Sequence, residues 1–474
     1  MREFLEQLLG TENVLHEPED MAAYREDFTE VEPVDPGLVA FVTKTEQVQA
    51  IVRKAGKQGM PVTARVAGTN IGGLALASEG GLILDLSRMN RVVEVNADDM
   101  YAVLEPGVTQ QQIKDHLREN DLPLTLGFSL APPYTSVALN ALMGGLTNRS
   151  LKYGDQSLWI SGLEVVLADG SLVRTGSWAL SDSAYGLVPF PDLSGLFIGW
   201  VGTTGIVTKV VFQLWPLHPL NKRLFILSYG IKGTYDAMRR LCRTETCDDI
   251  GGLSWPSAKM MLGVKRPHPE PAAGDPIFFL YVDLTAETVA EMAAKEDVLR
   301  DVLSEVRRGG ERFEAPLEVG ELVKVNPGLA AFADFPTDLE FLTSHGGGGL
   351  TWIGTYGPLS RFAEAAEAGS AVMARRGFAP LIVSRPMRGG HFGVLRLISI
   401  FDKKDADEVR RVRELNLELL RLLQARGFIM YKTPAWAWKE LAPKIDPGML
   451  SLMRRVKGLL DPAGIMNPGK LGLD

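Results

Sequence analysis

The sequence has little cysteine and no long apolar run, and each shortage excludes a class of protein. Its two cysteines, Cys242 and Cys247, cannot build a disulfide framework and are not spaced as CxxC, so we expect reduced thiols. No segment reaches the roughly 18 uninterrupted apolar residues of a membrane span. The N-terminus, MREFLEQLLGTENVL, is acidic and lacks the apolar stretch of a signal peptide. We therefore predict a cytoplasmic protein without a membrane span.

An excess of positive charge is missing as well. The formal net charge is −8, which argues against nucleic acid as the main partner. No Gly-rich segment has the GxGxxG spacing of a Rossmann NAD site or the GxxxxGK[ST] spacing of an ATPase. At 474 residues, the chain is long enough for two or three domains.

Two patterns follow one another along the chain. As far as residue 215, short β-rich runs alternate with Gly-rich turns and two helical stretches, TEQVQAIVRKAGKQG, with Thr45 as its N-cap, and VTQQQIKDHLREN. Asp169 and Gly170 between two apolar runs predict a β-hairpin. From residue 216 to 424, strands alternate with long helices, which indicates an antiparallel sheet covered by helices. We therefore predict an α+β fold divided into residues 1–215, 216–424 and 425–474.

Glycine-rich segments recur in the first region and close the chain. They are VAGTNIGG, SLAPPYTSVALNALMGGLTNRSLKYGD, FIGWVGTTGIVTKV and, at the end, NPGK. Each sets Gly beside Thr, Ser or Asn, a composition that offers free backbone N–H groups and small hydroxyl donors to anions such as pyrophosphate. A single segment of this kind is better explained as a tight turn, but three in one region together with PGK favour a bound ligand.

The order and spacing of these blocks resemble the FAD-binding oxidoreductases of the vanillyl-alcohol oxidase and p-cresol methylhydroxylase type. The resemblance covers nearly the whole chain and includes YGDQSLWISGLEVVLADGSLVRTG and LLDPAGIMNPGKLG. It implies an FAD-binding domain in two pieces, residues 1–215 and 425–474, with an inserted substrate cap domain over residues 216–424. It also implies a small-molecule substrate and an electron acceptor or electron-transfer protein.

The same resemblance assigns the cofactor residues. The first loop would wrap the FAD pyrophosphate through Ala67, Gly68, Thr69, Asn70, Ile71, Gly72 and Gly73. The second block would line the flavin and ribityl side through Pro133, Thr135, Ser136, Asn140, Gly144, Gly145 and Tyr153. The third would hold the adenine end through Gly202, Gly205, Ile206 and Val207, and the tail would close on the ring through Asn467 and Lys470. Lys470 is a candidate counter-charge for reduced flavin; the alternative is a solvated lysine in the tail.

Candidate catalytic residues come from two segments. In RGFIMYKTPAWAW, Tyr431 and Lys432 stand where phenol-oxidising relatives have Tyr-Arg, while Ile71 and Ala131 replace a second tyrosine and an aspartate base of those relatives. The segment also supplies Trp436 and Trp438 as flat apolar walls.

The second segment, RPMRGGHFGVLRLISIF, resembles the GHxGDGNxH stretch of FAD-dependent 2-hydroxy acid dehydrogenases. His391 matches its first histidine, and Arg388 or Arg396 are candidates for gripping a carboxylate. The missing Asp and second His predict that no metal is bound. His391 is a candidate general base.

Relatives also tether their flavin to a His or Tyr near GGLTWIGTYG. This chain has neither residue at the aligned tethering position, so we expect non-covalent FAD, with His345 in a flexible loop; a tether to His345 is the alternative. The resulting hypothesis is a dehydrogenase or oxidase that moves hydride from a small aromatic or alicyclic alcohol, or an alkylphenol-like substrate, to flavin N5. The alternatives are a 2-hydroxy acid dehydrogenase of the glycolate or D-lactate type and a flavin-binding subunit of a larger redox complex; a homo-oligomer is also open.

Overall fold

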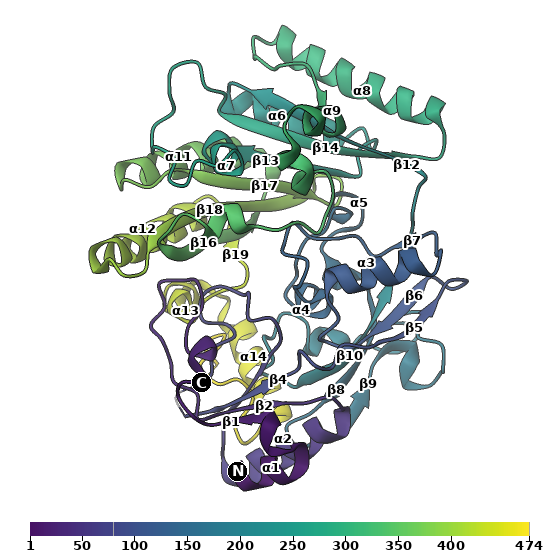
Figure 1. Cartoon of the computed structure of the whole chain (residues 1–474), viewed down its shortest axis with the longest axis vertical. Helices are drawn as coiled ribbons and strands as arrows, with labels where there is room; N and C mark the ends of the chain where they lie inside the picture. The colour runs from purple at the N-terminus through teal and green to yellow at the C-terminus, as the bar shows by residue number, and fades with distance from the viewer. Residues whose placement is uncertain (79, 474) are drawn as a thin grey trace.

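The computed structural model describes residues 1–78 and 80–473. Figure 1 shows two stacked parts: a lower part that holds the first half of the chain together with the C-terminal helices, and an upper part built on one large sheet. Both chain ends lie in the lower part. Within the described residues, no helix combines the length and apolar character that crossing a lipid bilayer requires.

The lower part begins with a small sheet that carries the first Gly-rich loop. Its strands are β1 (Val14–Leu15), β2 (Leu38–Phe41), β3 (Val62–Arg65) and β4 (Leu82–Asp85), in the order β1-β2-β4-β3. β4 pairs in parallel with β2 and β3, so a helix, α2 (Thr45–Gln58), makes the crossover from β2 to β3. Helix α1 (Arg2–Leu9) contacts α2.

The predicted N-cap of α2 is wrong by one residue. Lys44 is the N-cap, and the Gln47 side chain accepts a hydrogen bond from its backbone N–H at 3.2 Å. Thr45 is the first helical residue, and its hydroxyl donates instead to the buried Glu164 at 3.2 Å. A glutamine three residues after the N-cap supplies the reciprocal half of a capping box, which replaces the threonine.

The second sheet of the lower part is antiparallel. Its strands are β5 (Val92–Asn96), β6 (Tyr101–Leu104), β8 (Ile160–Val166), β9 (Leu172–Arg174) and β10 (Ile206–Gln213), in the order β5-β6-β10-β8-β9. The β8–β9 hairpin turns at Asp169 and Gly170 as predicted, with Gly170 at φ 78°. Three helices, α3 (Gln110–Glu119), α4 (Val137–Leu142) and α5 (Ser150–Tyr153), and a two-stranded ribbon of β7 (Leu124–Thr125) and β11 (Trp215–Pro216) complete this part.

The upper part is an eight-stranded sheet in which every neighbouring pair is antiparallel. Its order is β15 (Leu317–Glu318), β12 (Leu220–Ser228), β14 (Phe278–Ala286), β13 (Asp249–Ser254), β17 (Leu381–Met387), β18 (Phe392–Asp402), β16 (Gly348–Gly357) and β19 (Ile429–Met430). Its helices are α6 (Ile231–Cys242), α7 (Trp255–Met261), α8 (Val289–Arg308), α9 (Val319–Val325), α10 (Glu340–Thr343), α11 (Phe362–Arg375) and α12 (Ala406–Gln424). The predicted α+β class with a helix-covered antiparallel sheet is confirmed, although β19 extends the sheet past residue 424.

The C-terminal segment returns to the lower part. After α13 (Ala435–Leu441) and α14 (Pro447–Leu460), the tail pairs with β3: Val62 N–H donates to Ile465 O at 2.8 Å, and Asn467 N–H donates to Val62 O at 2.9 Å. The buried Lys457 amine ties this tail together, donating to Met466 O at 2.8 Å and to the Asp461 carboxylate at 2.5 Å. The end of the chain therefore lies beside the first Gly-rich loop.

Candidate functional site

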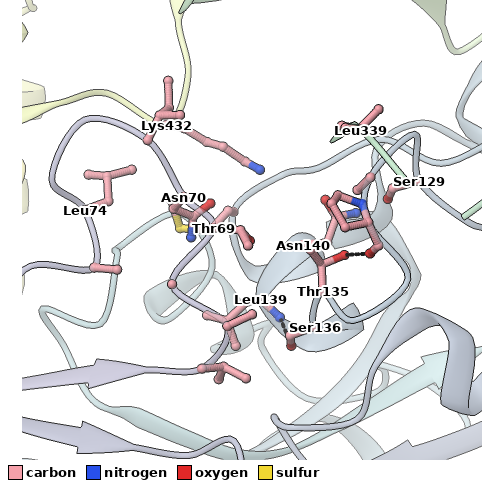
Figure 2. A pocket seen from close by; sticks show the side chains of 18 of the residues that line it. Thr69, Asn70, Leu74, Ser129, Thr135, Ser136, Leu139, Asn140, Leu339 and Lys432 are labelled. Atoms are coloured by element: carbon pink, nitrogen blue, oxygen red, sulfur yellow. Dashed lines mark hydrogen bonds between the residues drawn. The ribbon is translucent and has the colours of Figure 1, made fainter. Parts of the chain in front are cut away.

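One cavity of about 460 Å³ is lined jointly by the Gly-rich loops of the lower part and by strands of the eight-stranded sheet. Figure 2 shows side chains of both parts pointing into it, among them Thr69, Asn140 and Lys432. The predicted site residues in its lining are Ala67, Gly68, Thr69, Asn70, Ile71, Thr135, Ser136, Asn140, Gly202, Gly205, Ile206, Val207, Arg396, Lys432 and Asn467. The lining does not include Gly72, Gly73, Pro133, Gly144, Gly145, Tyr153, His391, Tyr431 or Lys470.

The first loop presents unused backbone donors to the cavity. Among the described residues, no protein acceptor takes a hydrogen bond from the backbone N–H of Gly68, Thr69 or Asn70. Gly68 has φ 66°, and a Cβ there would lie 2.4 Å from Nη2 of Arg65, which also lines the cavity. Glycine therefore lets a cation lie against a loop of free N–H groups, a combination that binds phosphate.

Two glycines of this loop do other work than the sequence predicts. The Gly73 N–H donates to the Asp27 carboxylate at 2.7 Å, and Gly73 O accepts from the Lys470 amine at 2.6 Å, so neither group is turned to the cavity. A Cβ on Gly72 would lie 2.6 Å from Cβ of Pro434. The close approach that Gly72 permits is therefore to the segment after β19, and Lys470 anchors the loop from behind.

The second block enters the cavity through the start of α4. Ser136 is the N-cap of this helix, and its hydroxyl oxygen accepts from Leu139 N–H at 3.0 Å (Figure 2). The Asn140 amide donates to Gln156 Oε1 at 2.8 Å. A Cβ on Gly145 would lie 1.9 Å from Asn140 Oδ1, so this glycine makes room for the asparagine rather than for a ligand. Tyr153 stacks on Trp215 with ring centroids 3.7 Å apart, which keeps it out of the lining.

The third Gly-rich block and the C-terminal tail form a further wall of the cavity. Among the described residues, no heavy atom outside the immediate chain neighbours lies within 4 Å of the position that a Cβ on Gly202 would take, and this glycine has φ 72°. Asn467 joins the tail to both sides: its amide donates to Val201 O at 2.6 Å, and its Oδ1 accepts from the Thr63 hydroxyl at 3.0 Å. The sequence signal NPGK therefore marks a residue that closes the cavity, while its lysine lies outside.

The wall nearest the eight-stranded sheet carries cations. Lys432 has a left-handed backbone, φ 49°, which is unusual for a residue with a side chain. Its amine has no hydrogen bond or ion pair among the described residues. Burial and the nearby Arg396 guanidinium lower the pKa of Lys432 to about 7. An amine that is partly withdrawn from solvent and has no carboxylate partner is expected to lose its proton more easily in this way.

Arg396 is oriented by a tyrosine pair. Its Nε donates to the Tyr431 hydroxyl at 2.6 Å, and the Tyr431 ring stacks on Tyr356 with centroids 4.6 Å apart. The Tyr356 hydroxyl in turn donates to Gly144 O, and burial raises the pKa of Tyr356 well above its ordinary value. Tyr431 and Gly144 therefore support the wall without lining it.

Two buried donors in the lining have no partner within the described residues. They are Nε of Arg385 and Nε1 of Trp352. Arg385 is 3% exposed; its Nη2 donates to Asp249 at 2.5 Å and to Thr147 O at 2.7 Å, which fixes the guanidinium. A buried donor without an acceptor is costly, so this wall is suited to a ligand that brings oxygen acceptors.

The remaining candidates lie elsewhere. His391 is exposed in the turn between β17 and β18, next to Arg388. It was predicted to face the substrate, but it is not part of the cavity lining. This turn needs two glycines with positive φ, which explains the RGGH pattern without a catalytic role. Trp436 and Trp438 pack against the core of the upper part, and Trp352 provides the flat wall instead.

His345 is buried rather than in a flexible loop. Its Nδ1 accepts from Gly347 N–H at 3.2 Å and its Nε2 donates to Gly349 O at 2.9 Å. Burial lowers the pKa of His345, in agreement with this neutral arrangement. Both ring nitrogens are therefore engaged by the backbone.

Acidic groups are sparse around the cavity. Asp338 and Glu340 are the carboxylates in its lining among the described residues, and both are exposed. Over the same residues, no group of three His, Cys, Asp or Glu side chains is arranged to hold a metal ion. The sequence did not single out Arg65 or Trp352, because each lies outside the Gly-rich blocks and enters the site only through the fold.

These features fit FAD. Free N–H groups beside Arg65 suit a pyrophosphate, and Gly202, with open space at the position of its missing Cβ, leaves room on the wall formed by the third block and the tail. Apolar side chains between the two ends offer faces for flat rings, namely Leu139, Leu142, Met143, Ile206 and Val207.

Comparisons with known proteins agree with this geometry. The FAD binding domain family matches residues 36–176, and the family of FAD linked oxidases, C-terminal domain, matches residues 341–471. The 4-cresol dehydrogenase (hydroxylating) flavoprotein subunit of Pseudomonas putida is 27% identical, with 98% of this chain and 94% of the relative covered. The glycolate oxidase subunit GlcD of Bacillus subtilis is 25% identical, with 99% and 96% covered.

A solved structure has the same fold. The structure of p-cresol methylhydroxylase with substrate bound superposes with a TM-score of 0.87 at 24% identity, covering 100% of this chain and 96% of the other. The predicted fold is therefore confirmed, and the match to the FAD binding domain family confirms FAD as the predicted cofactor. The chain is an FAD-linked oxidoreductase of the p-cresol methylhydroxylase and vanillyl-alcohol oxidase type.

Proposed function

We propose that this oxidoreductase removes hydride from a small alcohol that carries a negatively charged oxygen on a flat apolar body. The observation that carries the proposal is the cationic wall of the cavity, formed by the guanidinium groups of Arg385 and Arg396, with the Lys432 amine beside them. Arg396 and Arg385 are held by Tyr431 and Asp249, so both present fixed donors before a ligand arrives. Preorganised donors lose little entropy when they bind an anion.

The rest of this wall accounts for the apolar body. The cavity is lined here by the indole of Trp352 and by the aliphatic side chains of Leu253, Leu350, Val383 and Ile398. These side chains offer contact area and no competing acceptor, while the unpartnered Trp352 Nε1 adds one donor. An aromatic or alicyclic substrate therefore fits better than a short, fully polar one.

Two of the alternatives retain specific support. The arginines suit the carboxylate of a 2-hydroxy acid, and one relative is a glycolate oxidase subunit. Another relative is the flavoprotein subunit of a larger enzyme, so an electron-transfer protein as the acceptor is part of the proposal.

The test is anaerobic reduction of the purified flavoprotein by a panel of compounds, and the loss of flavin absorbance measures the rate of reduction. The panel contains mandelate, glycolate, D-lactate, benzyl alcohol and 4-ethylphenol. We expect mandelate to bleach the flavin faster than glycolate or benzyl alcohol, because it alone joins the anion, the alcohol and the ring. Faster bleaching by glycolate and D-lactate would favour the hydroxy-acid alternative, and bleaching by none would contradict the proposal.

We also propose that FAD is bound without a covalent link, supported by the engagement of both His345 ring nitrogens with the backbone. Acid precipitation should release all of the flavin into the supernatant. A yellow pellet would contradict this proposal, and mass spectrometry of its peptides would identify the attachment residue.

A further inference from the structure

The proposed alcohol oxidation needs a group that takes the hydroxyl proton, and the cavity offers few candidates. The titratable side chains in its lining are Arg65 after β3, Tyr134, Asp338 and Glu340 at the start of α10, Arg385 on β17, Arg396 on β18 and Lys432 after β19. No histidine lines the cavity among the described residues. The guanidinium groups stay protonated in proteins and cannot accept a proton.

Position separates the remaining candidates. Asp338 and Glu340 are exposed and Tyr134 is 55% exposed, so all three are in contact with solvent. The Lys432 amine instead reaches into the cavity, as Figure 2 shows, from the segment that also carries Tyr431. Among these candidates from the described residues, Lys432 is therefore the one that lies at the cationic wall, near Arg396.

The backbone at Lys432 is held in place from both sides. On one side, the Thr433 hydroxyl donates to Met430 O at 3.1 Å and closes the turn that contains Lys432. On the other, Pro434 packs against Gly72 so closely that a Cβ on the glycine would lie 2.6 Å away. A left-handed, non-glycine residue fixed in this manner is typical of functional sites, where the surroundings maintain a strained conformation.

We infer that Lys432, as a neutral amine, is the proton acceptor of the reaction. The substrate O–H bond breaks and an N–H bond forms on Nζ, while the C–H bond electrons leave as hydride to oxidised FAD; the O–H bond electrons become the second bond of the C=O group of the product. The ammonium returns its proton to solvent when the product leaves. This inference rests on the proposed function, since it needs an alcohol substrate.

The charges that face Lys432 are consistent with a neutral amine in the resting site. The charged group that acts on the pKa of Lys432 is Arg396 of β18, which repels a second positive charge, and no buried carboxylate lines the cavity among the described residues to stabilise one. With a pKa of about 7 for Lys432, lowered first by burial and then by Arg396, the amine is mostly neutral above that pH. A base with a pKa close to the working pH is the most effective.

The first test measures the amine itself in the holoprotein and needs no substrate. Trace acetylation with acetic anhydride at a series of pH values, followed by peptide mass spectrometry, gives the midpoint at which Lys432 becomes reactive. Lys439, exposed on α13, is the internal reference. We expect a Lys432 midpoint near 7; a midpoint near the ordinary lysine value of about 10.4 would overturn the inference whatever the substrate is.

The second test separates a base from a fixed charge. Lys432→Arg places a permanent positive charge that cannot accept a proton at this position, and Lys432→Met provides neither a charge nor a proton acceptor. We expect flavin reduction by mandelate to slow by about 100-fold or more in both variants. The wild-type rate should rise as the pH passes 7, and this rise should be absent in both variants. A wild-type rate in Lys432→Arg with a slow Lys432→Met would overturn the inference and leave the proposed function standing.

The outcome for the proposed function is distinct. Failure of every alcohol in the panel to reduce the wild-type flavin would contradict the proposed function and this inference together. Reduction by an alcohol with a flat pH profile and an ordinary Lys432 midpoint would contradict the inference alone.

Discussion

Replacing Gly202 with alanine tests whether the cavity is the FAD site. Gly202 lines the cavity with φ 72°, and apart from its chain neighbours no heavy atom in the described part of the chain lies within 4 Å of the added Cβ position. Gly199 has φ 79° and an equally open Cβ position, but it lies outside the cavity lining. Gly199→Ala is therefore a matched control for the backbone strain.

The expected magnitudes follow from this comparison. An L-residue in the left-handed region costs about 1–2 kcal/mol, so both variants should unfold at a similarly reduced temperature. Only Gly202→Ala adds a methyl group to the space for the cofactor, and crowding of this kind costs about 1–3 kcal/mol. At about 1.4 kcal/mol per factor of ten, FAD should bind roughly 5- to 150-fold more weakly in that variant.

The assay is a titration of each apoprotein with FAD, followed by quenching of the flavin fluorescence, with thermal unfolding recorded in parallel. Equal FAD affinity in wild type, Gly199→Ala and Gly202→Ala would refute the placement of FAD along this wall. Equal weakening in both variants would show that strain, and not the cavity, sets the affinity.

Two further predictions concern buried ionisable groups. Lys457→Met should lower the free energy of unfolding by about 3–5 kcal/mol in urea titrations, because it leaves the buried Asp461 carboxylate without its cation; Arg454→Met, at an exposed position of the same helix, should change it little, and equal effects would contradict this account. Burial raises the pKa of Glu30 in the folded chain. As the pH rises past the pKa of the unfolded chain, the unfolded chain loses this proton while the folded chain keeps it. The free energy of unfolding therefore falls as the pH rises from the unfolded-state pKa through the folded-state pKa. Glu30→Gln should therefore raise the melting temperature at pH 7 more than at pH 4, whereas the exposed Glu32→Gln should not; a uniform change would contradict it.

Local patterns in the sequence were sufficient for much of the fold. The apolar spacing of α2, the Asp169–Gly170 turn and the alternation of long helices with strands after residue 216 are short-range features, and each appears where it was expected. The resemblance predicts that the NPGK tail returns to the FAD-binding domain, and in the structure Asn467 pairs with Val62 of β3, beside the first loop.

The cationic wall and its neighbour Trp352 were harder to predict because these residues come from separate strands. Arg385, Arg396 and Trp352 lie on β17, β18 and β16, which the sheet brings side by side. Their convergence depends on strand register, since a shift of one residue would turn each side chain to the other face. The sequence singled out Arg396 of this wall, but it also favoured His391, whose neighbouring glycines form a turn outside the cavity lining.

In the first loop, too, contacts between residues distant in sequence limit what the sequence can predict. Its composition predicts free N–H groups, and the structure provides them at Gly68, Thr69 and Asn70. That of Gly73 is instead taken by Asp27, a residue 46 positions earlier in the chain. Competition between a ligand and a distant carboxylate for one donor has no local signal in the sequence.

The most direct test of the account is a titration of the oxidised holoprotein with benzoate, an unreactive aromatic anion, followed by the flavin absorption spectrum. If FAD and the cationic wall share one cavity, benzoate should perturb the spectrum saturably, neutral benzamide should bind more weakly, and Arg396→Met should weaken benzoate but not benzamide. Arg388→Met, in the turn outside the cavity, should bind benzoate as wild type does. No spectral change with benzoate, or equal benzoate affinity in wild type and Arg396→Met, would contradict the account.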